Sequence, residues 1–158
     1  MRDFKRDLGK GNAGEKRVIE LLSKFAPTKK VPHTTHNYDL VLTHNDVDYS
    51  IEVKTDFYAK KSGNLAIEFH NSKLDAPSGL NATGAQLWVH SFLDKIHITT
   101  VDELKKFCKK NKPLKTVIAG GDSNSNMWIF EIDRIGKIFH EINEENLEEV
   151  ICLLTSKL

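Results

Sequence analysis

The stretch of sequence that decides the fold is Tyr38-Asp39-Leu40-Val41-Leu42, followed after seven residues by Ser50-Ile51-Glu52-Val53-Lys54. Both segments are rich in the apolar side chains typical of strands, and the turn residues His44-Asn45-Asp46 lie between them. We therefore predict a hairpin with Asn45-Asp46 as its two-residue turn. In that register, the numbers of paired residues sum to 91.

This register gives the hairpin one apolar face, on which Leu40 lies opposite Ile51. It also places Asp39 directly opposite Glu52, with Lys54 on the same face. A slip of one residue would scatter the apolar side chains over both faces, so burial selects this register. Opposed side chains lie about 5 Å apart, and like charges there are destabilising. The two carboxylates are therefore expected to be solvated, to share a proton or to be bridged by a cation.

A divalent cation between these carboxylates would give the hairpin a chemical role. Mg²⁺ binds one or two carboxylates and completes its octahedron with water and phosphate oxygens. The ion polarises a phosphodiester and lowers the pKa of its bound water. Lys54 would then orient the attacking water or stabilise the negative charge that develops. The alternative is that Glu52-Val53-Lys54 is an ordinary polar strand face.

The pattern of an aspartate, twelve intervening residues and Glu-x-Lys, with a helix before and strands after, resembles the PD-(D/E)XK nuclease superfamily. Tyr38 stands where that family has its proline. The resemblance implies a restriction-endonuclease-like core in which Asp39 and Glu52 bind Mg²⁺ or Mn²⁺. It further implies the Val53 carbonyl as a third ligand and Lys54 as the catalytic lysine.

Two further glutamates are candidates for the same site. Many members of the superfamily have a glutamate on the first core helix, and Glu15 fits that place. It lies three residues before Val18, on the apolar side, where an unpaired carboxylate is costly. Asn12-Ala13-Gly14-Glu15 is equally a capping box, so both interpretations stay open. Glu68, on the third strand, is a secondary candidate, with an exposed strand glutamate as its alternative.

The likeness extends to phage-type resolvase-like members of the superfamily. It rests on weaker blocks, which are Gly63–Glu68, Pro77–Thr83, Leu87–Val89 and Gly120–Asp122. It implies DNA as the partner and selection of DNA by its structure. Short polar turns flanking the site suit contacts to phosphate and sugar. Their candidate residues are Lys60, Lys61, Asn64, His70, Asn71, Lys73, Asn81 and Thr83.

The rest of the chain predicts an α/β fold with a central mixed sheet flanked by helices. We expect a first helix over 13–25 with Asn12 as its N-cap, a helix capped by Thr100 and a last helix over 144–156. The expected strands cover 38–43, 47–56, 65–69, 87–92, 95–99, 117–119 and 127–132, with a short helix or ordered loop over 80–86.

Composition favours one packed domain over 1–158, since the chain is 39% hydrophobic and 28% charged. We expect neither a signal peptide nor a membrane span. Cys108 and Cys152 occupy apolar positions and are expected to be buried free thiols, which points to a reducing, cytoplasmic location, including a host cell if the chain is phage-encoded. Basic residues concentrate in 1–30 and 105–115, which fits either a polyanion-binding face or a solvated one.

Together these patterns predict a Mg²⁺-dependent DNA endonuclease. Cutting two strands is most simply done by a two-fold pair of sites, so we expect a homodimer. One alternative is a catalytically degenerate DNA-binding module of the same fold. Another is a plain structural domain whose hairpin carries an ion pair.

Overall fold

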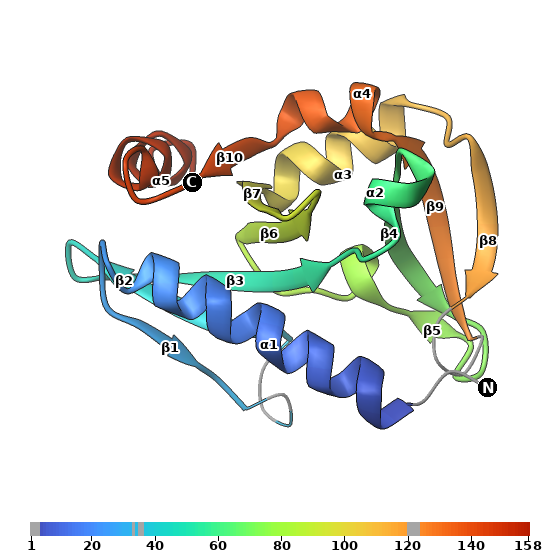
Figure 1. Cartoon of the computed structure of the whole chain (residues 1–158), viewed down its shortest axis with the longest axis horizontal. Coiled ribbons are helices and arrows are strands. Elements are labelled where there is room, and N and C mark those ends of the chain that lie inside the picture. Colours follow the sequence, from blue (N-terminus) through green and yellow to red (C-terminus); the bar gives the residue numbers. More distant parts are fainter. Residues whose placement is uncertain (1–3, 33, 35–36, 120–123) are drawn as a thin grey trace.

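The computed structural model describes residues 4–32, 34, 37–119 and 124–158, with side chains from residue 9 onward. Within these ranges the chain forms a mixed α/β fold built on two sheets (Figure 1). The larger sheet has the strand order β1-β2-β3-β6-β7-β10, and the smaller has the order β5-β4-β9-β8. The predicted α/β class with a central mixed sheet flanked by helices is confirmed.

The helices are α1 (Phe4–Leu22), α2 (Ala59–Ser62), α3 (Val101–Lys110), α4 (Ile132–Ile135) and α5 (Leu147–Thr155), with short 3-10 turns η1 (Gly79–Asn81) and η2 (Gly136–Ile138). The strands are β1 (Thr28–Lys30), β2 (Leu40–His44), β3 (Val47–Thr55), β4 (Asn64–Asn71), β5 (Ala76–Pro77), β6 (Leu87–Phe92), β7 (Lys95–Thr100), β8 (Lys115–Ala119), β9 (Ser125–Glu131) and β10 (His140–Ile142).

The β2–β3 hairpin has the register that the apolar pattern predicts. Leu40 pairs with Ile51, and the last pair before the turn is His44 with Val47. Asn45 and Asp46 both have positive φ, at 52° and 60°. Positive φ at both central residues defines a type I′ turn, whose twist matches that of the two strands. The two-residue turn and the register are confirmed.

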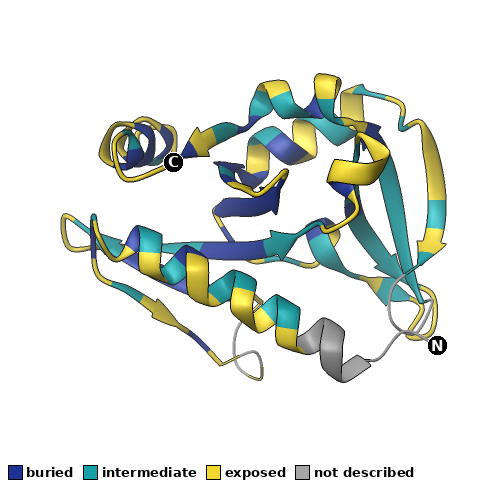
Figure 2. Ribbon diagram, viewed as in Figure 1, coloured by how far each residue is buried: buried dark blue, intermediate teal, exposed yellow. Residues whose placement is uncertain are grey.

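Strand β3 lies in the middle of the larger sheet. It pairs antiparallel with β2 on one side and parallel with β6 on the other. Ile51 and Val53 point into an apolar cluster that also contains residues of α1 and α5. Trp88, on β6, belongs to a second cluster with residues of α3, β4 and β9. Figure 2 shows the buried stretches of β3 and β6 in dark blue.

Helix α1 begins well before the predicted residue 13, at Phe4, and ends at Leu22. Asn12 therefore lies inside the helix and is not its N-cap, so the capping-box interpretation of Glu15 is wrong. A Cβ atom added to Gly14 would lie 2.4 Å from the Thr55 hydroxyl oxygen. Glycine at this position thus lets α1 lie directly against β3, and this packing outweighs the low helix propensity of glycine.

The short strands β1, β5 and β10 and the separation into two sheets were not predicted. Strands of two or three residues carry too little alternation to be recognised from sequence. The predicted block Gly120–Asp122 lies outside the described residues. No helix in the described part of the chain has both the length and the apolar composition that crossing a membrane requires.

The prediction of two buried thiols is wrong for Cys152, which is exposed on α5. The apolar face of α5 is formed by its neighbours at helical spacing, including Val150, Ile151 and Leu154, and Cys152 lies beside that face. Cys108 is half-buried, and burial raises the pKa of its thiol to about 12.

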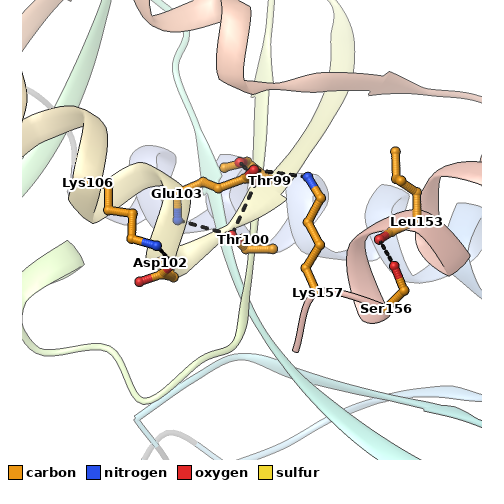
Figure 3. A network of polar contacts seen from close by, with 8 residues as sticks. All are labelled: Thr99, Thr100, Asp102, Glu103, Lys106, Leu153, Ser156 and Lys157. Atoms are coloured by element: carbon orange, nitrogen blue, oxygen red, sulfur yellow. Dashed lines mark hydrogen bonds and ion pairs between the residues drawn. The ribbon is translucent and has the colours of Figure 1, made fainter.

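Polar contacts hold the C-terminal segment to the start of α3 (Figure 3). The Thr100 hydroxyl accepts a hydrogen bond from the Glu103 amide at 3.1 Å, which confirms the predicted N-cap. The Lys157 Nζ lies 3.0 Å from a carboxylate oxygen of Glu103. The end of the chain is thereby joined to the larger sheet through α3.

We predict that Ile51→Ala lowers the free energy of unfolding by about 2–5 kcal/mol, because it leaves a cavity in a site that is fully buried. Urea denaturation measures the change. Val47→Ala on the same strand is the matched control, since Val47 is exposed and its loss is expected to cost less than about 0.5 kcal/mol. Equal losses for the two variants would contradict the burial assigned to Ile51.

Candidate functional site

The start of β2 and the end of β3 bring Asp39, Glu52 and Lys54 to one pocket of about 230 Å³. The far wall of the pocket is formed by the segment around η1. The lining residues are Asn37, Tyr38, Asp39, Glu52, Lys54, Gly79, Ala82 and Thr83. Three of the predicted catalytic residues are thus brought together by the fold.

Glu52 is held by two partners from different parts of the chain. Its side chain is largely buried, and one carboxylate oxygen lies 2.6 Å from the Lys54 Nζ. The other oxygen accepts a hydrogen bond from the Thr83 hydroxyl at 3.0 Å. Thr83 in turn accepts a hydrogen bond from the Ala85 amide, which fixes its orientation. The position of the Glu52 carboxylate is therefore set before any ligand binds.

Asp39 is 5% exposed and lies just outside the β2–β3 ladder. Its amide donates to the Ile51 carbonyl, and its carboxylate accepts a hydrogen bond of 2.7 Å from the Val53 amide. The expectation that Asp39 lies directly opposite Glu52 in the ladder is therefore wrong. Each carboxylate accepts a hydrogen bond from its own donor, which is the Val53 amide for Asp39 and the Thr83 hydroxyl for Glu52. The Val53 amide, rather than its carbonyl, is the contact that the structure describes.

Lys54 carries a positive charge at neutral pH. Burial favours its neutral amine, but the charges of Glu52, Asp39 and Glu68 together outweigh burial, so the pKa of Lys54 lies above its usual value. The ammonium group also lies 6.0 Å from the centroid of the Trp88 ring. In the metal-free protein this side chain is therefore the ammonium partner of the Glu52 carboxylate.

Trp88 and His90 form a buried floor beneath these charges. In the parallel pairing of β3 with β6, Glu52 lies beside Trp88 and Lys54 beside His90. The Trp88 indole donates to the His90 Nδ1 at 3.2 Å. Burial lowers the pKa of His90 to about 3, and the charges of Lys54 and His97 act in the same direction. The sequence signal for this floor, Trp-x-His within a buried strand, is too common to be specific.

The remaining carboxylate candidates lie at the margin of the site. Glu15 is partly buried, and one of its oxygens lies 2.6 Å from the Lys30 Nζ. It is not among the described residues that line the pocket. Glu68 influences the pKa of Lys54, and its backbone packs against Gly79, which lines the pocket. Their catalytic roles stay predictions.

The predicted phosphate and sugar contacts fall into three places. Thr83 lines the pocket, and Asn81 is exposed on η1 beside it. The others gather at the two ends of β4, roughly 20 Å apart for a strand of this length. Lys60, Lys61 and Asn64 lie at its beginning, and His70, Asn71 and Lys73 lie at its end.

Several of these side chains already have partners in the protein. Lys60 forms an ion pair with Asp94 at 2.9 Å. The side-chain carbonyl of Asn71 accepts hydrogen bonds from the amides of Lys73 and Leu74, so it stabilises the turn after β4. His70 lies 3.4 Å from a carboxylate oxygen of Asp75. Contacts of these side chains with nucleic acid stay predictions.

The donor set fits a hard divalent ion that keeps most of its water. Among the described residues, no three His, Cys, Asp or Glu side chains gather closely enough to hold a metal. Asp39 and Glu52 supply two buried carboxylates in one pocket. Mg²⁺ binds proteins in this way, through one or two carboxylates together with waters and substrate phosphate oxygens.

No family model and no curated protein matches this chain. One solved structure that it resembles is that of the bacterial homing endonuclease I-Ssp6803I, with 16% sequence identity and a TM-score of 0.53. The alignment covers 99% of this chain and 94% of that one. At this identity the likeness shows a shared fold over nearly the whole of both chains.

We predict that His90 makes stability depend on pH. The folded protein keeps His90 neutral down to about pH 3, whereas the unfolded chain binds a proton near pH 6.5. Stability is therefore lost as the pH falls through 6.5, by up to about 2 kcal/mol between pH 6.5 and 5. Urea denaturation at these pH values measures it.

The matched variant is His90→Asn, which keeps an acceptor for the Trp88 indole and has no group that titrates in this range. We expect a shallower loss of stability between pH 6.5 and 5 than in the wild type, whatever its absolute stability. Parallel pH profiles for the two proteins would refute the neutral, buried state of His90.

Proposed function

We propose that this protein is a DNA endonuclease that hydrolyses phosphodiester bonds with Mg²⁺ or Mn²⁺ at a PD-(D/E)XK site. The observation that carries the proposal is the pocket in which Asp39, Glu52 and Lys54 meet. Two carboxylates and a protonated amine in one pocket form a set suited to a metal ion and a phosphate group.

The fold adds independent support for this class of activity. The chain shares its fold with a protein described as a homing endonuclease, over almost its full length. The sequence motif was identified from spacing alone, and the pocket gathers its three side chains on adjacent strands. The motif, the pocket and the fold therefore all favour hydrolysis of a phosphodiester. We propose that the chain has a restriction-endonuclease-like core.

Asp39 and Glu52 would hold the metal ion, with the Val53 carbonyl as a further candidate ligand. When bound, the ion would polarise the phosphodiester and lower the pKa of a water molecule. The Val53 amide keeps Asp39 in place, and Thr83 keeps Glu52 in place. Ordered ligands of this kind reduce the cost of arranging the site when the substrate binds.

Lys54 would bind a non-bridging oxygen of the scissile phosphate or orient the attacking water. In the metal-free protein, despite burial, the charges of Glu52, Asp39 and Glu68 hold the pKa of Lys54 above its usual value, which favours a role as a cation. A fixed cation at this place stabilises the negative charge that grows on the phosphate in the transition state. The buried floor of Trp88 and the neutral His90 adds no competing positive charge below it.

DNA is the proposed substrate, and a homodimer is the proposed assembly. Phosphate contacts at the polar turns would make binding depend on salt and little on sequence. A two-fold pair of sites would place one pocket on each strand of a duplex.

We predict that Lys54→Ala lowers the rate of plasmid cleavage in Mg²⁺ by at least about 100-fold, because it removes the cation that stabilises the transition state. Conversion of supercoiled to nicked and linear DNA measures the rate. Lys137→Ala is the matched control, since Lys137 is exposed on η2, outside the pocket and outside both basic segments.

Cleavage by Lys54→Ala at the wild-type rate would show that this pocket is not the active site. Binding of DNA by the wild type without cleavage in Mg²⁺ or Mn²⁺ would favour the alternative of a degenerate DNA-binding module. Neither binding nor cleavage would favour the structural domain.

We also predict that Mg²⁺ and Mn²⁺ raise the melting temperature of the wild type, because a ligand that binds the folded state alone stabilises it. At a hundred times the dissociation constant the gain is about 2.7 kcal/mol. Asp39→Asn removes one of the two charged ligands and is expected to lose most of the shift. Thermal melts at fixed ionic strength measure both, and equal shifts would place the ion elsewhere.

A further inference from the structure

The turn that follows β3 exposes two aromatic side chains close to the candidate site. Phe57 is 55% exposed and Tyr58 is 53% exposed. They follow Lys54 by three and four residues, and three residues of chain span at most about 10 Å. Successive bases of DNA are about 3.4 Å apart along each strand. The backbone of Phe57 therefore lies within about 10 Å of the Lys54 backbone, with that of Tyr58 one residue further, and a few nucleotides span such a distance.

This turn is held rigidly by Asp56. One oxygen of its carboxylate accepts hydrogen bonds from the amides of Tyr58 and Ala59, and the other accepts one from the Ala66 amide at 3.1 Å. The Asp56 amide donates to the Ser91 carbonyl on β6. Four backbone contacts thus tie the turn to α2, β4 and β6. The backbone that carries the two aromatic residues is therefore an ordered turn.

One lysine contacts the Phe57 ring, and two more lysines follow the turn on α2. The Lys10 Nζ of α1 lies 5.1 Å from the centroid of the Phe57 ring. Lys60 and Lys61 follow on α2, with Asp94 as the acidic partner of Lys60. A single exposed apolar side chain needs no explanation. Two adjacent rings beside several cations combine a stacking surface with charges for the backbone, which is how single-stranded nucleic acid is bound.

We propose that Phe57 and Tyr58 form a stacking platform for unpaired bases next to the scissile phosphate. This inference rests on the proposed nuclease function and names its substrate class, which is DNA whose base stacking is interrupted by a nick, a gap or a branch. Such DNA offers free base faces to the platform, whereas an intact duplex must first be unstacked at a cost in free energy. Selection then follows from DNA structure and is largely independent of sequence, since every base has a face that stacks.

The test compares two DNAs of the same sequence, an intact duplex and a duplex with a three-nucleotide gap. Binding of the full chain is followed by fluorescence anisotropy in EDTA and in Ca²⁺. A 2-aminopurine base opposite the gap reports stacking through quenching of its fluorescence. We expect the wild type to prefer the gapped DNA and to quench the probe.

The double variant Phe57→Ala/Tyr58→Ala is expected to bind the gapped DNA about 5- to 100-fold more weakly, as loss of aromatic stacking predicts. Its affinity for the intact duplex should change little, and it should not quench the probe. The matched control is Leu153→Ala, an exposed apolar side chain on α5, which should behave as the wild type. Melting temperatures of all variants should be similar, because these side chains are exposed.

Three results would overturn the platform. If the wild type cleaves DNA and the double variant binds both DNAs as the wild type does, the platform fails and the nuclease function stands. If the double variant keeps its DNA binding but loses self-association in sedimentation, the rings are an interface between copies of the chain. If the wild type neither binds nor cleaves any of these DNAs, the proposed function fails and the platform fails with it.

Discussion

Strand β3 imposes the constraint on which the rest of the structure depends, because it is paired on both edges and packs one face against the apolar cluster with α1 and α5. Side chains alternate between the faces of a strand, so Ile51 and Val53 enter one apolar cluster while Glu52 and Lys54 must point the other way. The Glu52 carboxylate placed there is largely buried and has to be neutralised locally. The ion pair of 2.6 Å between Glu52 and Lys54 provides that neutralisation.

Hydrogen bonds stabilise the buried carboxylates as well. Asp39 lies outside the ladder, and its carboxylate accepts a hydrogen bond from the Val53 amide. The Thr83 hydroxyl, next to η1, donates a hydrogen bond to Glu52. Partly buried ion pairs add little to stability once desolvation is counted, so stability alone gives little reason to keep two carboxylates and an ammonium group here. Binding of a charged ligand by these preorganised groups gives a physical reason for the presence of the two carboxylates and the ammonium group.

The sequence was most informative where burial leaves few alternatives. The register of the hairpin, its two-residue turn and the Thr100 cap follow from apolar alternation and turn chemistry, and the structure has all three. It was least informative where tertiary contacts decide the local backbone. The glycine inside α1 is explained by its packing against Thr55, and the position of Asp39 is explained by one hydrogen bond to Val53. The burial of His90 could not be predicted, since it comes from the neighbouring strands β3 and β7 and from Phe139, far along the chain.

The close approach of α1 to β3 has a consequence for how this sequence can change over evolutionary time. The Thr55 hydroxyl fills the space that a side chain at position 14 would need, because a Cβ atom added to Gly14 would lie 2.4 Å from that oxygen. A larger residue at position 14 requires a smaller one at position 55, immediately after Lys54. Descendants of this chain are therefore expected to alter the two positions together, so that correlated substitution would record the contact between helix and strand.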